Sequence, residues 1–96
     1  MTAFYKYSAA EISNGIKQKQ FSARDVIESA LSRLDSVNPS INAVIDTHHG
    51  DALANDDRID HSIARDESLG DLAGVPVTIK VNIDQAGKIN TNGLLI

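Results

Sequence analysis

The sequence predicts an α/β protein that is cut before its sheet is complete. Segments with helical and strand-like patterns follow one another in the order α, α, β, α, β. Residues 75–80 alternate apolar and other side chains, as a strand does. Leu94-Leu95-Ile96, just after the turn dipeptide Asn92-Gly93, resemble the start of a core element. We therefore expect residues 1–96 to form a single incomplete N-terminal segment of a larger domain.

The first helix is expected over residues 9–19. Ser8 and Glu11 have the spacing of a capping box, in which each side chain bonds the backbone N–H of the other. Ile12 and Ile16 then lie one turn apart on the same face. Gly15 weakens the prediction, because glycine inside a helix costs about 1 kcal/mol relative to alanine.

The second helix is expected over residues 23–37, after Ser22 as its N-cap. Asn38-Pro39 should stop it, because the residue before a proline disfavours helical backbone. Its apolar positions form one stripe that should face the core: Val26, Ile27, Ala30, Leu31, Leu34 and Val37.

A short strand over residues 41–46 and a third helix over residues 50–66 are expected next. The helix has a thin apolar side and many aspartates, so it should lie on the surface. Residues 67–74 form a loop that contains Gly70 and Gly74.

The last predicted strand, residues 75–80, ends on Lys80. Ligands of open α/β sheets gather outside the carboxyl ends of strands, which makes this lysine a candidate for chemistry. Spacing alone favours a simpler interpretation, a solvated charge that discourages pairing at a sheet edge.

Composition excludes several classes of function. The net charge is −4 and only two tyrosines and two phenylalanines are present, so nothing supports nucleic-acid binding. No apolar run is long enough to span a membrane. The absence of cysteine rules out disulfides and thiolate ligands and fits a cytoplasmic location. No cofactor is expected, because no phosphate-binding glycine motif is present.

No metal site is expected either. His48 and His49 are adjacent and cannot converge on one ion, and His61 has no histidine one turn away. The cluster of Asp56, Asp57 and Asp60 lacks the spacing of a calcium loop, so it is interpreted as a solvated helix face.

Residues 72–80, followed by Asn82-Ile83-Asp84, Ala86-Gly87 and Thr91-Asn92-Gly93, resemble the N-terminal part of the amidase signature family. The resemblance extends over nearly the whole chain from residue 8. It includes the helix start at Ser22-Ala23, the phrase at residues 37–43, and Ala52-Leu53-Ala54 with Asp60. Its sharpest part is residues 72–87.

The resemblance implies a serine hydrolase of carbon–nitrogen bonds. It implies that this chain is the N-terminal fragment of a mixed-sheet α/β/α fold, in which helices wrap the sheet. It implies a nucleophilic serine, a second serine on a cis peptide bond, and a lysine that matches Lys80. Both serines would lie beyond residue 96, so this segment alone should be inactive. The substrate of the complete protein would be a small-molecule amide.

A neutral lysine amine can take the proton of a serine hydroxyl through an intervening serine. Lysine is charged at neutral pH, so its pKa must be lowered. We expect Val75, Val77 and Ile79 to supply an apolar wall for this. The chain departs from the family at Val81, where aspartate is usual, and at residues 89–91, where Pro-Thr-Thr is common.

An alternative function is a short, non-catalytic interaction protein. In that case a partner chain, or a second copy, would complete the unfinished sheet by strand addition.

Overall fold

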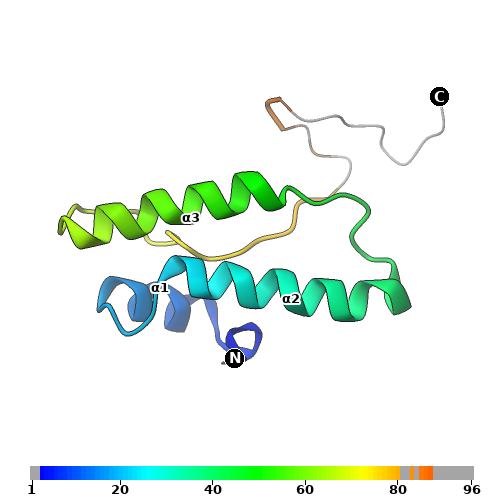
Figure 1. Ribbon diagram of the computed structural model, residues 1–96, viewed down its shortest axis with the longest axis horizontal. Helices are drawn as coiled ribbons and strands as arrows, with labels where there is room; N and C mark the ends of the chain where they lie inside the picture. Colours follow the sequence, from blue (N-terminus) through cyan, green and yellow to red (C-terminus); the bar gives the residue numbers. More distant parts are fainter. Residues whose placement is uncertain (1–2, 81–82, 84, 88–96) are drawn as a thin grey trace.

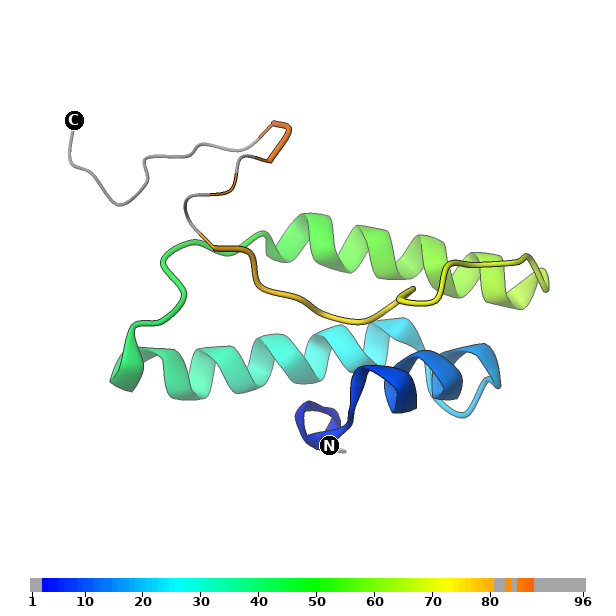
Figure 2. The same cartoon turned by 180° about the vertical axis from the view of Figure 1, so that it is seen from behind.

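The computed structural model describes residues 3–80, 83 and 85–87. A short 3₁₀ turn, η1 (Phe4–Lys6), precedes three helices, α1 (Ala9–Lys17), α2 (Ala23–Ile41) and α3 (His49–Ala64). The two long helices α2 and α3 lie side by side and run in opposite directions (Figure 1). α1 and η1 pack beside the first half of α2, and the chain after α3 returns along the pair of long helices (Figure 2).

The described residues contain no strand, so the prediction of an α/β mixed sheet is wrong for this structure. The strand predicted over residues 41–46 is absent, because Ile41 ends α2 and residues 42–48 form a loop. Residues 75–80 are not helical, but they form no β-ladder hydrogen bonds with another segment in the described part of the chain. Alternating apolar residues favour extended backbone, whereas a strand also requires a neighbouring backbone to share its hydrogen bonds.

α2 continues four residues beyond its predicted end and contains Pro39. The proline lies in the last turn and lacks one backbone N–H donor, and the helix ends two residues after it. The helix stops at Asn42, whose φ of 49° is left-handed. Asn38 then holds the loop, because its side-chain amide donates to the carbonyl of Val44 at 2.8 Å and accepts from its N–H at 2.9 Å.

The other two helices agree with their predictions to within two residues at each end. α1 begins at Ala9 behind the complete Ser8–Glu11 capping box and ends at Lys17. α3 has no side-chain hydrogen bond at its N-cap, His48. Its one buried residue is Asp56, which is consistent with a helix that covers the surface of a small core.

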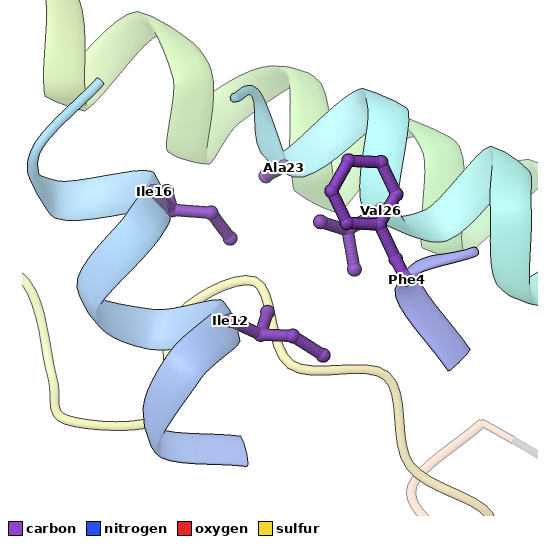
Figure 3. Close-up of a cluster of buried hydrophobic side chains, with 5 residues drawn as sticks. All are labelled: Phe4, Ile12, Ile16, Ala23 and Val26. Carbon is purple, nitrogen blue, oxygen red and sulfur yellow. The ribbon is translucent and has the colours of Figure 1, made fainter. Parts of the chain in front are cut away.

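The core lies where η1, α1 and the start of α2 meet (Figure 3). Its buried side chains point toward one another and come from all three elements: Phe4, Ile12, Ile16, Ala23 and Val26. Ile59 and Ile63 of α3 and Val75 cover the cluster from outside. The predicted stripe of α2 is buried only at Val26 and Ile27, because α2 extends past the core at its far end.

Gly15 has a packing role that its helix propensity concealed. The ring of Phe21 lies against its Cα, where a β-carbon would collide with it. Phe21 also contacts Phe4, with ring centroids 4.7 Å apart, and Tyr7, with centroids 6.0 Å apart. A glycine at this position therefore lets an aromatic cluster close one side of the core.

Several predicted features lie outside the described residues. These are Val81, the sequence at residues 89–91, the turn at residues 92–93 and the apolar residues 94–96. Among the helices that are described, none has the length and hydropathy needed to cross a membrane.

Candidate active site

Lys80 lies at the end of residues 76–80 and is exposed. The apolar wall expected around it is not formed by the described residues. Val77 is 72% exposed and Ile79 is 47% exposed, while Val75 turns instead toward the helical core. The structure therefore separates the beginning of this segment, which is anchored, from its end, which presents Lys80 to solvent.

The beginning of the lysine segment, defined here as residues 71–80, is tied to α1. The buried hydroxyl of Ser13 donates to the carbonyl oxygen of Asp71 at 2.5 Å. Lys17, one turn further along α1, places its amine 3.8 Å from the carboxylate of Asp71. The sequence does not single out Ser13, because a serine inside a helix gives no local sign of a contact 58 residues away.

Gly74 brings the same segment into contact with both α1 and α2. It is buried and has a φ of +85°, a backbone conformation that residues other than glycine rarely adopt. A β-carbon there would collide with Ile16 and would lie 3.3 Å from the β-carbon of Ala23. The glycine predicted only as a loop residue is thus where the lysine segment meets the core.

The amino terminus of α2 is held by two sets of contacts. Locally, Ser22 and Asp25 form a capping box, so the N-cap prediction is confirmed. From α3, Asp60 accepts hydrogen bonds from the N–H of Ala23 at 2.7 Å and of Arg24 at 3.0 Å, one with each carboxylate oxygen. The first N–H groups of a helix have no partner within it, and a carboxylate there also suits the helix dipole. Asp60 therefore joins α3 to the first turn of α2.

Asp56, Asp57 and Asp60 of α3 have different environments and do not form one solvated face. Asp57 is exposed and pairs with Arg24, with 2.9 Å between its carboxylate and the guanidinium. Asp56 is only 8% exposed. Burial, reinforced by the carboxylates of Asp60 and Asp57, raises the pKa of Asp56 to about 6.

In the part of the chain that the structure describes, no group of three or more histidine, cysteine or acidic residues is arranged to hold a metal ion. His49 instead contacts Thr47, with 2.9 Å between Nδ1 and Oγ1, and lies 3.9 Å from the carboxylate of Asp35.

A shallow cavity of about 290 Å³ lies where α3 ends, beside the end of α1. Its walls include the charged side chains of Lys17, Asp66 and Glu67 and the apolar side chains of Ile63 and Leu69. The residues that line the cavity do not include Lys80, and we do not include the cavity in the candidate active site.

Comparison with known proteins defines the class of protein to which this arrangement belongs. The model of the Amidase family matches residues 25–96, which include α2 from Asp25 onward, α3 and the whole lysine segment. The chain therefore belongs to the amidase family. No solved structure matches it.

Curated relatives agree with this assignment. Indoleacetamide hydrolase of Bradyrhizobium diazoefficiens is 37% identical over 90 residues, which cover 94% of this chain and 17% of the relative. A glutamyl-tRNA(Gln) amidotransferase subunit of Carboxydothermus hydrogenoformans is 41% identical over 83 residues, 86% of this chain and 17% of the relative. The corresponding protein of Clostridium acetobutylicum is 34% identical over 87 residues, 91% of this chain and 18% of the relative. The chain thus spans less than a fifth of the length of these relatives.

Proposed function

We propose that this chain is the N-terminal part of a serine-dependent amide hydrolase and that Lys80 is its general base. The observation that carries the proposal is the match of residues 25–96 to the Amidase family, because the matched region contains the lysine motif. One relative is an indoleacetamide hydrolase and others are amidotransferase subunits, which supports chemistry at the carbon–nitrogen bond of an amide. We infer a small-molecule amide as substrate. A cytoplasmic location stays a prediction.

The proposed chemistry requires three groups, of which this chain supplies one. The neutral amine of Lys80 accepts a proton through a second serine, and the nucleophilic serine then attacks the amide carbon. The proton is passed on to the departing amine when the carbon–nitrogen bond breaks. Both serines would come from sequence beyond Ile96, so the 96-residue chain alone is expected to be inactive.

The exposure of Lys80 bears on how this base would be tuned. Since Val77 and Ile79 are exposed beside it, residues 76–80 offer apolar surface that the rest of a complete domain can cover. We propose that the low-dielectric environment needed by Lys80 is created only when the complete protein folds.

The test uses the complete protein, expressed from its full reading frame, with release of ammonia from indoleacetamide and from a short aliphatic amide as readout. Lys80→Ala should abolish turnover and leave the circular dichroism spectrum unchanged. Lys6→Ala, which removes the charge of an exposed lysine in η1, should leave turnover unchanged. Near wild-type activity in Lys80→Ala, or turnover by the isolated 96-residue chain, would contradict the proposal.

The alternative function, an interaction protein whose sheet is completed by a partner, loses its structural premise. The described residues contain no sheet that a partner strand could extend. Self-association stays a prediction, and the measured mass of the chain in solution would test it.

A further inference from the structure

The direction in which Lys80 is presented depends on where the lysine segment leaves the core. Gly74 lies directly on Ile16 and Ala23, and Ser13 holds the carbonyl of Asp71 three residues earlier. Figure 3 shows Ala23 at the start of α2, facing the same cluster as Ile16. The first turn of α2 is therefore part of the surface on which Gly74 packs, and it helps to determine the direction in which the lysine segment leaves the core.

That first turn is held from α3 by Asp60. Both of its carboxylate oxygens are used, one for the N–H of Ala23 and one for the N–H of Arg24. Ala23 is completely buried, so its backbone cannot exchange these bonds for bonds to water without opening the core. We propose that Asp60 is a positioning residue for Lys80, acting through the amino terminus of α2 and Gly74; this inference rests on the proposed role of Lys80.

Local capping does not account for Asp60. The capping box already satisfies the N–H of Asp25 with the hydroxyl of Ser22. Asp60 accepts from the N–H groups of Ala23 and Arg24, the two residues before Asp25. It does so from another helix, 37 residues beyond Ala23 in the sequence. It thereby fixes α3 relative to the surface on which Gly74 lies, which a residue within α2 could not do.

The length of the segment amplifies small changes at its beginning. Lys80 follows Gly74 by six residues, which span up to about 20 Å when extended. A tilt of about 10° at Gly74 would then move the lysine by about 3 Å. A misplacement of about 1 Å in a catalytic group can cost a factor of about 100 in rate. Precise anchoring at Gly74 is thus a requirement of the proposed chemistry.

The first test measures the position of residue 80 without using activity. The chain contains no cysteine, so Ser32→Cys on the exposed side of α2 and Lys80→Cys give a unique pair of sites for spin labels. We expect Asp60→Asn to shift the mean interlabel distance or to increase the width of its distribution about twofold. The reason is that the asparagine amide has one oxygen to replace the two carboxylate oxygens that accept hydrogen bonds. Ser13→Ala should act in the same direction, since it releases Asp71.

The matched control is Asp57→Asn, which removes a carboxylate from the same helix and breaks an exposed pair with Arg24. It should leave the distribution unchanged. Circular dichroism must show that all variants remain helical. Identical distributions for Asp60→Asn and the parent chain would overturn the inference, whatever the outcome of the activity assays.

The second test separates positioning from the general-base role. In the complete protein, Asp60→Asn should lower kcat by about 10- to 100-fold with little change in KM, because the base is displaced while substrate binding remains. Asp57→Asn should leave both constants unchanged. If Lys80→Ala abolishes turnover but Asp60→Asn has normal kcat, the positioning role is refuted and the proposed function stands. If the complete protein hydrolyses neither amide, the proposed function fails, and the distance measurement alone decides the anchoring role.

Discussion

Asp56→Asn should stabilise the protein at neutral pH, although it removes a native charge. Asp56 is nearly buried on α3, and burial together with the carboxylates of Asp60 and Asp57 raises its pKa from 3.8 to about 6. The folded state therefore disfavours the ionised form that prevails at pH 7. An asparagine of the same shape carries no charge and avoids this penalty.

The direction of the pH dependence follows from proton binding. Between pH 3.8 and about 6 the folded protein holds a proton on Asp56 that the unfolded chain releases. Stability from this group is complete below pH 3.8 and is lost as the pH rises through about 6. The rise in the pKa of Asp56 corresponds to a change in the free energy of unfolding of about 3 kcal/mol, at about 1.4 kcal/mol per pKa unit. Because solvent and salt screen part of the repulsion, we expect a gain of about 1 to 2 kcal/mol for Asp56→Asn at pH 7.

Urea unfolding followed by circular dichroism, at pH values from 4 to 7.5, measures this difference. The free energies of unfolding of the wild type and Asp56→Asn should be similar at pH 4 and separate as the pH approaches 7. Asp57→Asn is the control, because its carboxylate is exposed and is the smallest of the three causes that raise the pKa of Asp56, so it should stabilise the protein at pH 7 by much less than Asp56→Asn. A variant that is less stable than the wild type at pH 7, or a difference that does not change with pH, would refute the reasoning.

Two further predictions concern packing and the end of α2. Gly15→Ala should destabilise the protein by about 1 to 3 kcal/mol in thermal unfolding, because the collision with Phe21 outweighs the gain in helix propensity. The added substitution Phe21→Leu should recover part of the loss. A Gly15→Ala variant that is more stable than the wild type would contradict the packing role of Gly15. Asn38→Ala should cost about 1 to 2 kcal/mol in urea unfolding, since it removes both hydrogen bonds to Val44. Asn38→Asp keeps an acceptor for the N–H of Val44 but sets a carboxylate oxygen against the Val44 carbonyl oxygen, so it should cost at least as much as Asn38→Ala at pH 7, and an Asn38→Asp variant as stable as the wild type would count against the pair of bonds.

Much of the helical structure was predictable because its signals are local. Ser8 and Ser22 begin helices through contacts that span only three residues, and the sequence contains both partners of each contact. The family was likewise recognisable from residues 72–87, a short run of unusual composition, and the comparison confirms it. The end of α2 was mispredicted, because the helix continues two residues beyond Pro39 and is stopped by Asn42 in a left-handed conformation.

The predicted strands failed for a different reason. Residues 75–80 have a strand's alternation, but a strand is completed by hydrogen bonds to another segment, and none forms among the described residues. The same limit hid Ser13, whose partner is the backbone of Asp71. Whether a period-two segment becomes a strand or remains an exposed extension depends on its neighbours, which its own sequence does not specify.

By itself, the sequence determined the family, the capped starts of two helices and the lysine at the end of residues 75–80. Only the tertiary structure decided that Asp60 closes the first turn of α2, that Asp56 is buried beside it, and that Gly74 lies on the core. The physical reason is separation along the chain. Caps act over one helical turn, whereas a carboxylate's hydrogen bonds and its pKa depend on groups that folding brings together from distant positions.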